Sequence, residues 1–146
     1  MAYKNASSTY KETTIKTAGQ GQLIVMLYDE AVKQLTKAVE LLEQNAKKKD
    51  PGKIEQISKA IMKTEEILTE LMVSLDFEQG GEISKNLFSL YTWFNRELLE
   101  ANINKDINRM LTVRDMISDL RNAWSQISNQ SSEKTNREAA GLDIAG

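Results

Sequence analysis

The chain has 146 residues, of which 40% are hydrophobic and 27% charged, and its formal net charge is −2. These totals fit one globular domain with one core. The absence of cysteine and histidine excludes disulfides, thiolate or imidazole catalysis, and the Cys and His ligands of zinc sites. The small net charge gives phosphate-backbone binding little support, so we expect no nucleic-acid partner.

The N-terminal segment, residues 1–18, is polar, with Tyr3, Tyr10 and Ile15 spaced along it. Its first residues, MAYKNASSTYKE, lack the hydrophobic stretch of a signal peptide. No apolar run in the chain approaches the ~20 residues that span a bilayer. We therefore expect a cytoplasmic (cytosolic) protein without direct membrane insertion. The segment is expected to be flexible, with Tyr10 either incidental or part of an extended segment that lies in a nearby groove.

The first predicted helix runs from about Gln20 to Asn45, because its apolar residues recur every three or four positions. This stripe consists of Ile24, Leu27, Ala31, Leu35, Ala38 and Leu42. The polar run AKKKDPGK ends the pattern. Asp50 then suits the N-cap of the next helix, and Pro51 suits its first position.

The second predicted helix, from about Pro51 to Leu75, follows a heptad pattern in which only Thr64 is polar. Its apolar positions are Ile54, Ile57, Ile61, Leu68, Leu71 and Leu75. The pair Gly80-Gly81 follows. A phosphate-binding loop would need a strand and a Gly-x-x-x-x-Gly-Lys-Ser/Thr pattern, and neither is present. A glycine C-cap on the second helix explains the pair more simply.

At this corner we expect Asp76 and Glu78 to be solvated or hydrogen-bonded, and Phe77 to cover the end of the core. A third helix is predicted from about Glu82 to Ala101. Its stripe consists of Ile83, Leu87, Leu90, Phe94, Leu98 and Ala101. After the connection NINKD, with Asp106 as cap, a last helix is predicted to about Ser128. Its stripe consists of Ile107, Met110, Val113, Ile117, Leu120, Trp124 and Ile127.

Short connections between long helices force neighbouring helices to run antiparallel. The sequence therefore predicts an all-α, up-down-up-down four-helix bundle with a flexible N-terminal segment and a disordered C-terminal tail. We expect the bundle over residues 19–128 and the tail over residues 129–146, where large apolar side chains are few.

Three of the helices carry more apolar residues than one core-facing stripe needs. The third adds Phe88, Tyr91, Trp93 and Leu99, and the first begins with the almost wholly apolar LIVMLY. Met62, Met72 and Val73 widen the second. One interpretation is that a small bundle buries broad faces and exposes some apolar side chains. The other is that the excess forms a groove for a partner's helices.

Acidic residues are the remaining candidates for chemistry. Asp29, Asp76, Glu78, Glu82 and Glu100 could in principle bind a divalent cation, but a metal site in a bundle needs carboxylates projecting into the core, usually with Glu-x-x-His pairs. The core-spaced positions here are almost wholly aliphatic, so these acids are expected on solvated faces. We expect no metal, no cofactor and no catalytic residue, and therefore no enzyme.

Two segments resemble the FliS family of flagellar secretion chaperones: TAGQGQLIVMLYDEAV, and LMVSLDFEQGGEISKNLFSLYTWFNRELLEAN. A fourth helix with Trp124 near its end completes the likeness, which extends from about Tyr10 to Ile127. The second segment carries the stronger signal. Its residues in family order are Leu71, Ser74, Leu75, Asp76, Gly80, Gly81, Ile83, Leu87, Tyr91, Asn95 and Ala101.

The resemblance implies a chaperone that binds newly made flagellin in the cytoplasm. It would hold the disordered C-terminal segment of flagellin, prevent premature filament assembly, and deliver the complex to the flagellar type III export gate. It also implies that the segment containing Tyr10 covers part of the binding surface until flagellin displaces it.

We expect partner contacts along the helices, although several of these positions also fit the core. The predicted partner-binding residues are Tyr10, Leu23, Ile24, Leu27, Tyr28, Met72, Leu75, Phe88, Tyr91 and Phe94. The alternative is a structural or oligomerising helical bundle without chaperone activity, whose extra apolar residues form a homodimer.

Overall fold

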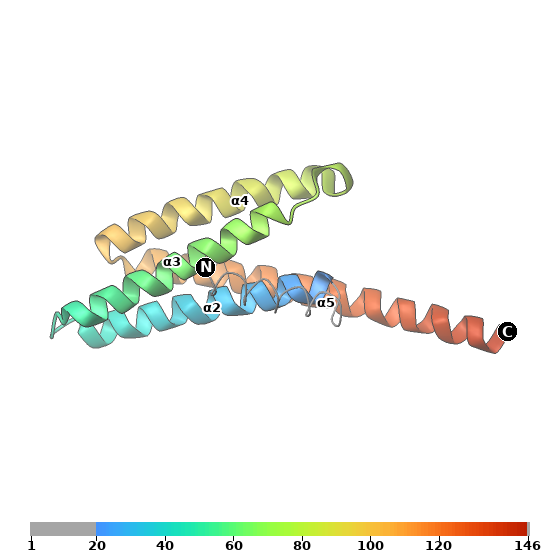
Figure 1. The fold of residues 1–146 in the computed structure, drawn as a ribbon, viewed down its shortest axis with the longest axis horizontal. Helices are drawn as coiled ribbons and strands as arrows, with labels where there is room; N and C mark the ends of the chain where they lie inside the picture. The colour runs from blue at the N-terminus through green and yellow to red at the C-terminus, as the bar shows by residue number, and fades with distance from the viewer. Residues whose placement is uncertain (1–19, 146) are drawn as a thin grey trace, which may run out of the picture. The chain divides into compact units, whose positions relative to one another are not determined.

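A computed structural model describes the backbone of residues 20–145 and the side chains of residues 21–129 (Figure 1). The described backbone is helical apart from short connections. The helices are α2 (Gln20–Asn45), α3 (Pro51–Val73), α4 (Phe77–Asn104) and α5 (Ile107–Ala145). The described residues divide into two compact units: unit 1 comprises residues 20–26 and 119–145, and unit 2 comprises residues 27–118.

Unit 2 holds most of α2, all of α3 and α4, and the start of α5, which alternate in direction along the chain. This arrangement confirms the predicted all-α, up-down-up-down architecture. Thr64, the one polar residue of the α3 heptad, is fully buried and donates from Oγ1 to the Ala60 carbonyl at 3.0 Å. The largest fully buried side chains are Tyr28, Leu35, Ile57, Ile61, Leu68, Leu71, Tyr91, Phe94, Leu98, Met110, Val113 and Ile117.

The corner between α2 and α3 is held by Asn45 and Asp50. The Asp50 amide donates to Asn45 Oδ1 at 2.6 Å, and Asn45 Nδ2 donates to the Asp50 carbonyl at 3.3 Å. Asp50 Oδ1 also accepts from the Gly52 amide at 2.9 Å, which satisfies an otherwise unpaired donor at the start of α3. Asp50 is therefore the N-cap and Pro51 begins the helix, as predicted.

The next corner corrects the prediction for the glycines. α3 ends at Val73, two residues before Leu75, with Ser74 as its cap in the right-handed region. Asp76 then caps α4, its Oδ1 accepting from the Glu78 and Gln79 amides at 3.0 and 3.1 Å. The glycine pair therefore lies inside α4 rather than at the end of α3, because a strong N-cap starts a new turn ahead of it.

Gly81 breaks α4 after its first turn, with φ 50° and ψ −123°. Only glycine adopts this mirror-image extended conformation readily. Beyond the break Ser84 is buried and donates from Oγ to the Asp76 carbonyl at 2.9 Å. The predicted stripe residue Ile83 is consequently 68% exposed. Phe77 is 47% exposed, so it covers the core only in part.

Both later helices extend beyond their predicted ends. α4 continues three residues past Ala101 and closes at Lys105, which takes the left-handed conformation with φ 52° and ψ 47°. Asp106 caps α5 as predicted, because its Oδ1 accepts from the Arg109 amide at 3.2 Å. α5 continues past Ser128 to Ala145, so residues expected to form the tail continue the helix.

In unit 1 the start of α2 lies close to α5. A Cβ atom on Gly21 would lie 2.9 Å from Ser128 Oγ, so glycine permits the two backbones to approach closely here. Ile127, predicted for the α5 stripe, is 55% exposed. The apolar stripe of α5 is therefore less buried near Ile127.

Candidate partner-binding surface

The structure divides the predicted partner-binding residues into three groups. Tyr10 lies outside the described residues. Leu23 and Ile24 lie in unit 1 and are half-buried. The remaining seven lie in unit 2, where burial separates framework from surface. These seven are Leu27, Tyr28, Met72, Leu75, Phe88, Tyr91 and Phe94.

Tyr28, Tyr91 and Phe94 belong to the core, with at most 2% exposure. The hydroxyls of Tyr28 and Tyr91 are hydrogen-bonded to each other. Burial raises the pKa of Tyr91, and the hydrogen bond with Tyr28 opposes that effect. These rings therefore offer a partner no surface as they stand, and they support the residues around them.

The line along which α3 and α4 pack brings two predicted contact residues to the same level. Ser58 on α3 donates to Asn102 Oδ1 on α4 at 3.1 Å, which fixes the register of the two antiparallel helices. One heptad along both helices this register pairs Glu65 with Asn95, and a second heptad pairs Met72 with Phe88. We call these six residues the α3–α4 seam.

Phe77 joins the apolar end of the α3–α4 seam. Its ring lies 6.0 Å from the Phe88 ring, edge to face, with an angle of 66° between the planes. Phe88 is 45% exposed, and Met72 is half-buried. Sequence reasoning missed Phe77 as a surface residue. The signal was Asp76, whose capping side chain makes the following residue the first of a new helix.

α3 and α4 carry many apolar side chains that are exposed rather than buried in the core. Met62, Val73, Phe88 and Leu99, which exceed the predicted stripes, are 45–81% exposed. Trp93 is half-buried and lies 5.8 Å from the Phe94 ring. Contiguous exposed apolar side chains are typical of surfaces that bind partners, and Phe77 and Phe88 are such neighbours. The exposed large apolar residues on these helices are Ile54, Met62, Val73, Phe77, Ile83, Phe88, Leu99 and Ile103.

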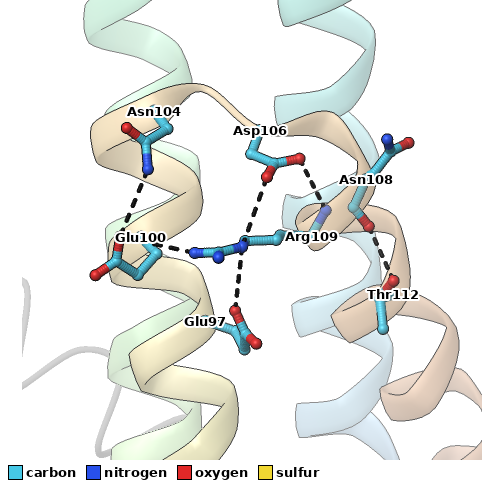
Figure 2. A network of polar contacts seen from close by, with 7 residues as sticks. All are labelled: Glu97, Glu100, Asn104, Asp106, Asn108, Arg109 and Thr112. Atoms are coloured by element: carbon cyan, nitrogen blue, oxygen red, sulfur yellow. Dashed lines mark hydrogen bonds and ion pairs between the residues drawn. The ribbon is translucent and has the colours of Figure 1, made fainter.

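Charged side chains at the α4–α5 corner serve the scaffold (Figure 2). The Arg109 guanidinium lies 3.5 Å from Glu97, 3.6 Å from Glu100 and 3.5 Å from Asp106. Among the residues whose side chains are described, no group of three potential ligands could hold a metal ion. Within α2–α5 no helix is both long and apolar enough to cross a membrane.

The described residues form a helical bundle with exposed apolar side chains beside a closed core. Residues 3–131 match the family described as Flagellar protein FliS. The chain belongs to the FliS family.

Three relatives are flagellar secretion chaperones named FliS. That of Salmonella typhimurium is 35% identical over 127 residues, covering 86% of this chain and 89% of the relative. That of Bacillus subtilis is 28% identical over 141 residues, covering 97% and 98%. That of Escherichia coli is 33% identical over 115 residues, covering 79% and 80%.

Proposed function

We propose that this protein is a cytosolic flagellar export chaperone that binds the disordered C-terminal region of flagellin. It prevents premature polymerisation and supports export through the flagellar type III secretion system. One observation carries the proposal: a chain of the FliS family, matched over most of its length by flagellar secretion chaperones, exposes large apolar side chains along α3 and α4.

The physical basis is the exchange of one apolar contact for another. A flagellin tail with apolar stripes would otherwise meet the same stripes on other flagellins. Ordering that tail on a chaperone costs conformational entropy, so binding needs a large contact area. Met62 and Met72 suit such a surface because a flexible thioether adapts to varied side chains.

We infer different roles for the predicted residues from their exposure. The half-exposed or half-buried side chains of Leu27, Met72, Leu75 and Phe88 can contact flagellin directly. In unit 1, Leu23 and Ile24 are expected to do the same. The fully buried Tyr28, Tyr91 and Phe94 hold the helices that carry these contacts.

Release occurs without catalysis in this proposal. The chaperone–flagellin complex docks at the export gate, and hand-over there removes flagellin.

The N-terminal segment covers part of the surface in the free protein. Deleting residues 1–14 is then expected to raise the flagellin on-rate or affinity, measured by surface plasmon resonance. An unchanged on-rate and affinity would show that Tyr10 does not cover the binding surface.

Calorimetric titration with the flagellin C-terminal segment tests the proposal. We expect a dissociation constant of micromolar or below, weakened about tenfold in Phe88→Ala because a half-exposed aromatic contact is lost. Ile103→Ala is the matched control, since Ile103 is an exposed apolar residue at the other end of α4. No heat of binding with a folded wild-type bundle would refute the chaperone function.

A further inference from the structure

Glu65 and Asn95 form the middle level of the α3–α4 seam, and no described side chain donates to the acceptor atoms of their side chains. Asn95 Oδ1 is buried and has no hydrogen-bond partner among the described residues. Glu65, on the same level of α3, makes no ion pair with any side chain of residues 21–129. Partial burial raises the pKa of Glu65. Both groups therefore cost the free protein stability, because a buried acceptor or carboxylate without a partner is unfavourable.

One heptad away, the same seam shows how such acceptors are satisfied. The Lys105 ammonium donates to Ser58 Oγ at 3.2 Å on α3, and to the Asn102 carbonyl at 2.8 Å on α4. It also donates to Asn102 Oδ1. The space between the two helices thus holds one lysine head group within reach of both. The middle level offers a comparable asparagine, with a carboxylate in place of the Ser58 hydroxyl.

We propose that the middle level of the α3–α4 seam binds a lysine or arginine side chain of the flagellin segment, held by the half-buried Glu65 carboxylate. Asn95 Oδ1, which is covered in the free protein, accepts from the same cation once the segment parts the side chains over it. This inference rests on the proposed function and adds a specificity-determining contact to it. A positive charge complements Glu65, and its N–H groups supply the donor that Asn95 lacks.

The apolar end of the seam then fixes the register of the bound segment. Met72 and Phe88 lie one heptad from Glu65 and Asn95, which is about 10 Å along a helix. A matching helical segment carries an apolar residue and a Lys or Arg seven positions apart. Apolar contact supplies most of the affinity, and the charge selects partner and register.

Calorimetry with the full chain and the flagellin C-terminal segment tests the assignment. We expect Glu65→Gln to weaken binding roughly tenfold, as for loss of one charge-assisted contact, and the loss to shrink in high salt. Glu66→Gln is the matched control, because Glu66 is the exposed neighbour on α3 and lies outside the seam. Unbound Glu65→Gln should melt at a higher temperature than wild type, since it removes a partly buried charge.

A second segment, with its Lys and Arg residues changed to Gln, separates a contact from an indirect effect. Wild type and Glu65→Gln should bind this segment equally, because the charge that distinguishes them is gone. If Glu65→Gln and Glu66→Gln both bind the native segment as wild type does, the seam assignment is wrong and the chaperone function stands. If wild type does not bind the native segment, both fail.

Discussion

The hydroxyl oxygens of Tyr28 and Tyr91, 63 residues apart in the chain, lie 2.5 Å apart in the core of unit 2. Their hydrogen bond joins α2 to α4, two helices that are not consecutive. Both rings are almost fully buried. This hydrogen bond therefore helps to fix the position of α2 relative to α4, although neither ring lies on the surface.

Replacing Tyr91 with Phe keeps the ring and removes the hydrogen bond. We expect the free energy of unfolding, measured in urea, to fall by about 1 kcal/mol. Tyr28→Phe should cost a similar amount. The double variant should lose less than the sum of the single losses, because both single changes remove one shared bond. Strictly additive losses would show that the two hydroxyls do not interact.

Alkaline pH should weaken the fold through Tyr91. Burial raises its pKa above the ordinary value of 10.0, so the folded protein favours the neutral phenol. The stability due to this group is complete below the unfolded pKa and is lost as pH rises through the folded pKa. In urea titrations, wild type should lose more stability than Tyr91→Phe above pH 10. Parallel losses would contradict this assignment.

Gly81→Ala should destabilise the fold by about 1–3 kcal/mol, because alanine at φ 50° and ψ −123° is strained even though the space around the position is open. Gly52→Ala in α3 is the control. A Cβ there meets Asp50 at an ordinary 3.4 Å, so the change should be neutral or stabilising. Equal melting temperatures for the two variants would rule out strain at Gly81.

The structure around Gly80 and Gly81 could not be predicted from hydrophobic periodicity. Hydrophobic spacing located each of the described helices α2–α5, because long amphipathic patterns identify the buried stripe. It misplaced Gly80 and Gly81, because Asp76 starts a helical turn that carries no apolar repeat. The caps at Asp50 and Asp106 were predictable from side-chain chemistry alone. The end of α5 was not, since helix-forming residues continue past the last core position.

Arg109 provides a test of the α4–α5 corner. Arg109→Met should cost about 0.5–1 kcal/mol, since three carboxylates lose their shared cation, and about 1 M salt should abolish most of the difference. Arg114→Met is the comparison, because among the side chains of residues 21–129 Arg114 forms an ion pair only with the adjacent Asp115, and the change should affect stability little. If the two variants behave alike, the network in Figure 2 contributes nothing beyond a single surface pair.

The surface was harder to predict than the fold. An apolar residue on a helix has the same sequence signal whether it enters the core, as Tyr91 does, or remains half-exposed, as Phe88 does. Only packing separates them. The α3–α4 seam likewise depends on a register set by Ser58 and Asn102, which no local pattern specifies.

In the proposed function the exposed apolar surface binds flagellin rather than a second copy of this chain. Light scattering during size-exclusion chromatography, with and without the flagellin C-terminal segment, distinguishes the two. We predict a monomer for the chain alone and a 1:1 complex for the mixture. A homodimer that takes up no flagellin would contradict the claim and identify an oligomerising bundle.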